Sequence, residues 1–276
     1  MAVNREESAM LRGRFGGPAR SVGAFFVLLV FVPPLLLLVS GSFQTPGRPP
    51  SQTPELIPRP ATAVGYELAF EWGGLLRATL NSLIVAAIAV PLSVLVASAA
   101  GFAITLLSRR ARIVVIGLSV AALMVPSTAL LVPRFALFRW AGLTNTFVPL
   151  VSPALIGMSP LYVLAFYLAF RAIPRDLYDA CLIEDLTPAR IWWRVAMPQV
   201  RPVTSAIAAL AFVTTWSNFL DPLVFVYDRD LFTLPLALRS LAALDPTDFP
   251  IFLAGAVFAT LPAVVVYSIA QRRFLQ

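Results

Sequence analysis

Apolar residues in this chain gather in six long runs, and the segments between the runs carry most of the charges. Each run has about 20 residues or more, enough for a helix rising 1.5 Å per residue to cross a hydrocarbon core of about 30 Å. The pattern therefore predicts an all-α, polytopic membrane protein with six transmembrane helices. The expected spans are Val22–Ser42, Thr79–Leu107, Ile113–Val132, Phe147–Phe170, Val203–Tyr227 and Phe249–Ala270.

The first run has two interpretations. A secretory signal peptide has an apolar stretch of about 7–15 residues before its cleavage site. Because Val22–Ser42 is longer than that, we favour an uncleaved helix over a signal peptide. The predicted organisation is a cytoplasmic tail at residues 1–21, followed by a single transmembrane domain at residues 22–276.

Arginines are divided unevenly between the two sides of the predicted membrane domain. If six helices alternate, fourteen of the 21 basic residues fall on one side and seven on the other, a segregation that an odd number of spans would destroy. Because cytoplasmic loops are enriched in basic residues, both termini are expected in the cytoplasm. The richer side holds Arg5, Arg12, Arg14, Arg20, Arg109, Arg110, Arg112, Arg171, Arg175, Arg190, Arg194, Arg201, Arg272 and Arg273.

Composition excludes several classes of function. Hydrophobic residues make up 59% of the chain and charged residues 13%, against about 25% charged in soluble domains. The chain has no lysine and no histidine, so it cannot contain a Walker A motif, and any ATP would be bound by another chain. The single cysteine, Cys181, excludes an internal disulfide and a cysteine-rich zinc site. The arginines flank apolar runs, so membrane topology accounts for the net charge of +7, and no nucleic-acid partner is expected.

Prolines mark the irregular parts of the chain. Six of them lie between Pro46 and Pro60, so residues 43–78 are expected to form an extended strap. The loop Asp228–Asp248 carries four aspartates and is expected to be solvated. Prolines also fall inside the spans, where they either bend packed helices or break helices that line a solute cavity. These prolines include Pro33, Pro34, Pro91, Pro126, Pro153, Pro160 and Pro262.

The segment between the fourth and fifth spans, residues 171–202, is predicted to form two short helices. Pro174 suits the first turn of a helix. Thr187 is a candidate N-cap, with Pro188 at the first helical position, and Pro198 is expected to end the second helix. The pattern alone leaves two readings open: an amphipathic loop that rests on lipid headgroups, or a surface that binds a partner.

This segment resembles the cytoplasmic "EAA" motif of ABC-importer permease subunits, which forms the coupling helix that seats in a cleft of the ATPase. Ile173-Pro174 match its opening and Pro198 its closing proline. Asp185 stands where the family has glycine; glycine suits a left-handed turn, and aspartate tolerates that conformation better than most residues do. The resemblance assigns ATPase docking to Asp179, Ala180 and Cys181 at the EAA triplet and to Glu184 and Asp185 after it.

Four further segments resemble the second inner-membrane permease of maltose-type importers. They are Thr79–Ala86, Trp216–Leu223, Thr233–Leu236 and Leu261–Gln276. The resemblance implies the type I ABC-importer permease fold, a bacterial-type inner membrane, and a sugar or sugar-like cargo. It also implies a non-catalytic subunit that works with a sister permease, an ABC ATPase dimer that binds ATP and Mg, and an extracytoplasmic solute-binding protein. Disaccharides, monosaccharides, polyols and glycerol phosphates all remain possible cargoes, and the sister permease could be different or identical.

A few polar residues inside the spans are candidates for the solute path. Asn218 and Asp221 lie three residues apart, on one face of a helix, with Trp216 nearby. Amides and carboxylates bind sugar hydroxyls and aromatic faces cover sugar rings, so these three residues and Asn81 are candidate cavity residues. For Asn218 the cavity and a packing role stay open. For Asp221, which Pro222 follows, we favour solvation at the outer interface over a place in the cavity.

Two other functions are compatible with the span pattern. A secondary transporter driven by an ion gradient usually places titratable carboxylates in the middle of the membrane, and here Asp221 is the one candidate. A non-transporting membrane scaffold would also explain the hydrophobicity, but it gives no reason for the loop motif. The ATP-driven importer is the leading hypothesis.

Overall fold

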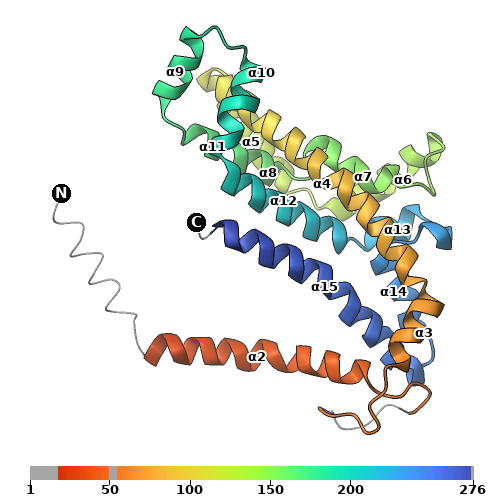
Figure 1. The fold of residues 1–276 in the computed structure, drawn as a ribbon. Coiled ribbons are helices and arrows are strands. Elements are labelled where there is room, and N and C mark those ends of the chain that lie inside the picture. The colour runs from red at the N-terminus through yellow and green to blue at the C-terminus, as the bar shows by residue number, and fades with distance from the viewer. Residues whose placement is uncertain (1–17, 50–54, 275–276) are drawn as a thin grey trace. The chain divides into compact units, whose positions relative to one another are not determined.

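The computed structural model describes residues 18–49 and 55–274, and within them the regular structure is helical, with no strand (Figure 1). The prediction of an all-α fold is confirmed. Most of the predicted cytoplasmic tail at residues 1–21 lies outside the described residues. By contacts between backbone positions the chain divides into two compact units, residues 1–69 with 244–257, and residues 70–243 with 258–276.

In the described ranges, four segments without a sharp bend and two sharply bent helix pairs are long and apolar enough to cross a membrane. Segments long and apolar enough to cross a membrane lie at Phe25–Ser42, Leu75–Leu106, Val148–Arg171 and Pro246–Ile269. Two helix pairs meet the same criterion jointly but bend by 86° and 87°, and counting each pair as one span gives six. The main helices of these four segments are α2 (Pro18–Ser42), α4 (Leu75–Leu106), α8 (Pro160–Arg171), which forms only the second part of Val148–Arg171, and α15 (Phe249–Phe274).

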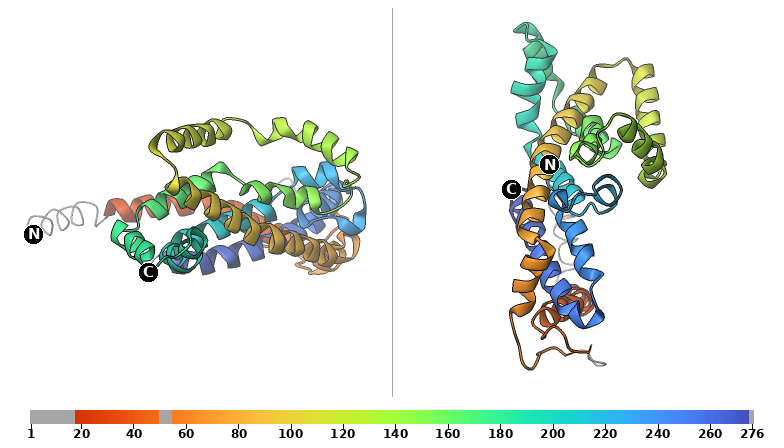
Figure 2. Two further views of the ribbon diagram at one scale, coloured as in Figure 1. Left: turned by 90° about the horizontal axis from the view of Figure 1, so that it is seen from above. Right: turned by 90° about the vertical axis from the view of Figure 1, so that its right-hand side faces the viewer.

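The third span is broken, which corrects the expectation of one helix over Ile113–Val132. Helix α5 (Arg109–Leu123) ends before Pro126, and the chain resumes as η1 (Ser127–Leu130) and α6 (Leu131–Trp140) after a bend of 86°. Proline has no N–H to donate and disfavours the helical conformation of the residue before it. Neither α5 nor α6 has a buried side chain, and Figure 2 shows both as an arm beside α4 and α8.

The fourth and fifth spans are also interrupted. The fourth consists of α7 (Val148–Val151), η2 (Ser152–Ile156) and α8, and the fifth of α12 (Arg201–Trp216) and α13 (Leu220–Phe225). The prolines in the spans lie in two kinds of place. Pro126, Pro153 and Pro160 lie at or next to breaks, whereas Pro33, Pro34, Pro91 and Pro262 lie inside continuous helices.

The prediction of an extended strap over residues 43–78 is wrong for its second half. Helix α3 (Val64–Gly73) forms there, and α4 begins at Leu75, because all six prolines lie before this stretch. The outer loop Asp228–Asp248 also folds, into η4 (Arg229–Leu231), α14 (Leu234–Ala242) and η5 (Pro246–Asp248).

Helix α4 forms the centre of the larger unit and packs closely against α8 and α12 (Figure 1). A close approach to α8 is possible because residue 101 is glycine: a Cβ there would lie 2.8 Å from the carbonyl oxygen of Val163 and 2.8 Å from the backbone nitrogen of Tyr167. Phe166 and Phe170 of α8 are fully buried in the resulting core.

In the smaller unit, the carboxyl end of α2 is held by the strap that follows it. The hydroxyls of Ser42 and Tyr66 lie 2.8 Å apart, and the backbone nitrogen of Thr62 donates to the carbonyl of Phe43 at 2.9 Å. Tyr66 also packs against Phe43, with ring centroids 5.4 Å apart. The described part of the strap that precedes α3 has no helix or strand, and these contacts hold it in place.

Candidate functional site

The first predicted site, the loop between α8 and α12, begins with helix α9 (Arg175–Ile183). Pro174 is the residue before the helix rather than part of its first turn. Two reciprocal hydrogen bonds close the carboxyl end, from the nitrogen of Leu186 to the carbonyl of Cys181 (3.1 Å) and from that of Asp185 to the carbonyl of Leu182 (3.1 Å). This is the Schellman arrangement, which places its C′ residue in the left-handed conformation.

Asp185 occupies that C′ position with φ of 49°. The expected left-handed turn at the family's glycine is therefore confirmed, although the residue is aspartate. A left-handed residue other than glycine costs about 1–2 kcal/mol, and aspartate is among the residues that accept it. The turn is thus preserved at some cost in stability.

The second half of the loop contains α10 (Pro188–Arg190), the π-helical turn η3 (Ile191–Ala196) and α11 (Met197–Gln199). Thr187 is the N-cap and Pro188 the first helical residue, as predicted. The prediction that Pro198 ends the helix is wrong: the chain stays helical to Gln199 and then bends by 87° into α12. A proline ring clashes with the carbonyl four residues earlier, and the wider π turn that precedes Pro198 leaves room for it.

One side of the loop is anchored in the core of the larger unit. Cys181, Ile191, Ala196 and Val200 are buried in one cluster with residues of α4 and α8. The hydroxyl of Tyr178 donates to the carbonyl of Phe170 at 3.0 Å. Burial raises the pKa of Tyr178, and the nearby Cys181 thiol raises it further, so this hydroxyl stays neutral and keeps its hydrogen bond. The loop is therefore fixed to the helices that it joins.

The other side of the loop is exposed and forms a projection, here called the knob, that carries both carboxylates and apolar side chains. Its exposed residues are Asp179, Ala180, Leu182, Ile183, Glu184 and Asp185. Four of the five predicted docking residues are exposed: Asp179, Ala180, Glu184 and Asp185. The fifth, Cys181, faces inward and belongs to the anchor. Sequence reasoning did not single out Leu182 and Ile183, which are 63% and 85% exposed. The only signal for them in the sequence is their position: both directly follow Cys181, the inward-facing residue near the end of α9.

A groove of about 1130 Å³ lies next to the loop, along α12. Trp193 and Met197 of the loop line one end of it, and α4 and α15 contribute the remaining walls. The hydroxyls of Thr204 and Ser205 donate to carbonyls of their own helix, so their oxygens can still accept hydrogen bonds from a solute. Its lining in α12 includes Arg201, Thr204, Ser205, Ala208, Ala209 and Phe212.

The predicted solute-path residues come together only in part. Asn218 and Asp221 are in contact, with the Asn218 amide donating to Asp221 Oδ2 at 3.2 Å. Trp216 faces away from them: its indole N–H donates to the carbonyl of Ala259 at 3.0 Å, and its ring stacks on Phe212. The Asn81 amide donates to the carbonyls of Asp230 and Phe232 at 2.9 and 3.0 Å, so it pins an outer loop. None of the four lines the groove.

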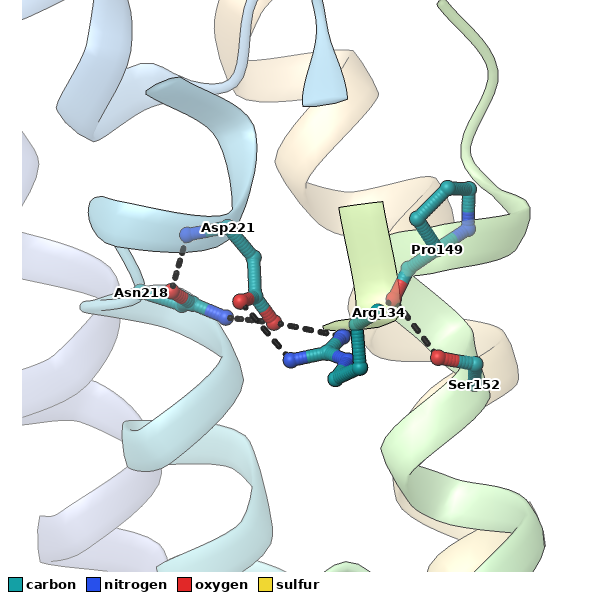
Figure 3. A network of polar contacts seen from close by, with 5 residues as sticks. All are labelled: Arg134, Pro149, Ser152, Asn218 and Asp221. Atoms are coloured by element: carbon teal, nitrogen blue, oxygen red, sulfur yellow. Dashed lines mark hydrogen bonds and ion pairs between the residues drawn. The ribbon is translucent and has the colours of Figure 1, made fainter. Parts of the chain in front are cut away.

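Asp221 is buried, with 7% of its surface exposed, so the favoured expectation of a solvated carboxylate is wrong. Its partner is Arg134 of α6, which donates to Oδ1 at 3.0 Å and to Oδ2 at 3.2 Å (Figure 3). Arg134 also donates to the carbonyl of Pro149 at 3.0 Å, and its guanidinium carbon lies 5.3 Å from the ring centroid of Phe225. A buried charge requires a partner of this kind.

Sequence reasoning missed Arg134 because it was assigned to an outer loop. The signal for the pair was available: both Arg134 and Asp221 are single charges inside apolar stretches, and such charges usually pair with one another. Metal binding has no comparable basis, since the described ranges contain no group of three or more acidic, cysteine or histidine residues close enough to hold an ion.

Comparisons with known proteins agree with this geometry. The family model described as "Binding-protein-dependent transport system inner membrane component" matches residues 61–276. The arabinooligosaccharides transport system permease protein AraQ of Halalkalibacterium halodurans is 30% identical over 258 residues, covering 92% of each chain. The lactose transport system permease protein LacG of Rhizobium radiobacter is 31% identical over 196 residues, covering 71% of each chain.

Two crystal structures of bacterial alginate ABC transporters have a similar fold. One matches with a TM-score of 0.75 and 16% identity, covering 99% of this chain and 98% of the other. The second, solved in complex with a periplasmic protein bound to an alginate pentasaccharide, matches with a TM-score of 0.65 and 14% identity, covering 91% of each chain. The helical arrangement, with its broken spans, is therefore that of ABC-importer permeases.

Proposed function

The chain belongs to the family of binding-protein-dependent transport system inner membrane components and is a non-catalytic permease subunit of an ABC importer, and on this premise we propose that its cargo is a sugar or sugar-like solute. The proposal is supported by relatives whose names specify arabinooligosaccharides and lactose. The hydroxyl and aromatic groups along α12 are also suited to polyhydroxylated solutes.

The exposed knob of the loop between α8 and α12 is the observation that carries the coupling part of this proposal. The knob presents Leu182, Ile183 and three carboxylates, while the opposite side of the loop is locked into the core. An exposed apolar pair on a rigid base is suited to insertion into a pocket of another protein. We assign this pocket to a separate ATPase subunit, which would bind ATP and Mg; no cofactor is assigned to this chain.

The proposed complex contains this permease, a sister permease, two ATPase subunits and an external solute-binding protein. The solute-binding partner is supported by the similar alginate transporter, whose structure includes a periplasmic protein. The protein is a multi-pass membrane protein, and we place it in a bacterial-type inner membrane with both termini in the cytoplasm. The arginine distribution supports that orientation, because basic residues are enriched on the cytoplasmic side. The same orientation puts the coupling loop on the side where ATP is available.

The proposed mechanism follows from the connection between the loop and the groove. Closure of the ATPase pair would displace the knob, and the anchored loop would pass this displacement through the 87° bend into α12. Because α12 lines the groove, its displacement would alter the access of solute to the path. Nucleotide and solute would thus bind at separate sites that are linked by one conformational equilibrium.

Replacing Asp179 with Arg tests the coupling role. The assay uses the complete complex in proteoliposomes with its solute-binding protein, and a panel of labelled arabino-oligosaccharide, lactose and trehalose. A carboxylate on the knob becomes a cation, so uptake and the stimulation of ATP hydrolysis should both fall, whereas Glu71→Arg on the exposed face of α3 should leave both unchanged. Normal transport by Asp179→Arg would contradict docking through the knob.

A further inference from the structure

Arg134 connects three interrupted segments of the larger unit. Its own helix, α6, follows the break in the third span; Pro149 lies in α7, at the start of the fourth; Asp221 lies in α13, beyond the break in the fifth. The guanidinium bonds to the other two segments, through Asp221 Oδ1 and Oδ2 and the Pro149 carbonyl. Figure 3 shows Arg134 between the two helices that carry these acceptors.

This attachment matters because it holds α6, the second half of the third span, whereas the first half, α5, packs on α8. Neither α5 nor α6 has a buried side chain. Apart from Arg134, α6 meets α13 through aromatic side chains: Phe135 and Phe138 lie against Phe225 with ring centroids 6.2 and 5.7 Å apart. The ion pair therefore fixes the position of α6 on α13 through directed hydrogen bonds, which the aromatic contacts do not provide.

The carboxylate side of the pair is equally well fixed. Asn218 donates its amide to Asp221 Oδ2 and accepts from the backbone nitrogen of Asp221, both at 3.2 Å. These two bonds span the junction between α12 and α13, so Asp221 follows the end of α12. The Arg134 and Asp221 side chains are only 24% and 10% exposed. Separating them would leave buried charges unpaired, which is strongly unfavourable.

We propose that Arg134 is a positioning residue for transport: through Asp221 it makes the third span move with α12, and the ion pair stays closed throughout the transport cycle. This inference rests on the proposed function, in which α12 carries the displacement of the coupling loop. The path would run from the loop to α12, from Asn218 to Asp221, and through Arg134 to α6 and α7. The pair would act as a rigid link, rather than as a latch that opens.

The first test measures coupling in the complete complex, purified through a tag on its ATPase so that only assembled permease is assayed. Arg134→Gln and Asp221→Asn should lower solute uptake per ATP hydrolysed by about fivefold or more, because ATP hydrolysis continues without moving the third span. Arg139→Gln is the matched control, since Arg139 lies on the same helix, is exposed and has no side-chain partner in the described ranges. Equal uptake per ATP in all variants would overturn the link.

The second test separates a closed link from a latch and does not depend on the single variants. Cysteines replace Arg134 and Asp221 in a Cys181→Ser background, and a short bis-methanethiosulfonate reagent joins them. A permanently closed link predicts that joining raises uptake per ATP above that of the unjoined double-cysteine complex, and that adding a reductant lowers it again. Loss of uptake on joining, with recovery on reduction, would show that the pair must open and would overturn the proposal.

Sugar uptake by the wild-type complex distinguishes a failure of the proposed function from a failure of the rigid link. A wild-type complex that hydrolyses ATP but takes up none of the labelled sugars contradicts the proposed sugar cargo. A wild-type complex that transports, with Arg134 and Asp221 variants equal to it, contradicts only the rigid link.

Discussion

At the scale of single residues, the turn at Asp185, the buried Cys181 and the Arg134–Asp221 pair hold the loop between α8 and α12 and the broken spans in place. The left-handed position at Asp185 was expected from the motif alone and is present, because a turn of this kind depends on neighbouring residues. Cys181 was expected on the docking surface and is buried, because which side of a short helix faces inward depends on α4 and α8. The Arg134–Asp221 pair joins residues 87 positions apart; isolated charges in apolar stretches signal that each needs a partner, but no local pattern specifies which two residues meet.

Asp185→Gly is expected to stabilise the coupling loop. Glycine adopts the left-handed conformation without the steric cost that aspartate bears, so the free energy of unfolding should rise by about 1 kcal/mol. The thermal midpoint of the detergent-solubilised complex measures this, and Asp179→Gly, within α9, is the control that should lower it. A lower midpoint for Asp185→Gly would mean that the aspartate side chain contributes more than the turn geometry shows.

Tyr178 predicts a pH dependence of the loop. Its pKa is raised by burial and then by Cys181, so the stabilisation is complete below the unfolded pKa of about 10 and is lost as pH rises through the higher folded pKa. The fluorescence of Trp192 and Trp193 should therefore change above about pH 10. Tyr178→Phe should lack this transition; an unchanged transition in that variant would assign it to another group.

At the scale of elements, hydropathy predicted where spans lie but not where they break. The limits of the first, second and sixth runs agree with α2, α4 and α15 to within about four residues, because length and apolarity decide those helices. The helices break after Leu123 and Trp216. A break frees backbone carbonyls, and it is tolerated only where neighbouring segments supply hydrogen-bond donors to them. Pro126 marks one break, yet Pro91 lies inside an unbroken helix, so proline alone does not decide.

The packing of α4 on α8 predicts contrasting effects for two glycines. Gly101→Ala places a methyl group 2.8 Å from backbone atoms of α8 and should destabilise the complex by about 1–3 kcal/mol. Gly117→Ala in α5 meets nothing within 4 Å and should stabilise by up to about 1 kcal/mol through helix propensity. Thermal midpoints of the two variants measure the contrast; equal midpoints would show that α4 and α8 can separate without cost.

At the scale of the whole molecule, the proposed function assigns the chain the transfer of force from an ATPase to the groove along α12. The coupling loop is exposed on one side and anchored on the other, and α12 continues from it along a groove. The buried carboxylate that could have served an ion-driven transporter is instead paired with Arg134. The ATPase, not this chain, would supply the energy.

The central claim is that the knob of the coupling loop seats on a separate ATPase. A photo-crosslinking residue, p-benzoylphenylalanine, placed at Ile183 tests it most directly in membranes that contain the assembled complex, with Leu118 of α5 as an equally apolar, exposed control. The account predicts a covalent adduct with the ATPase subunit from position 183 and none from position 118. Adducts from position 183 with lipid alone would contradict it.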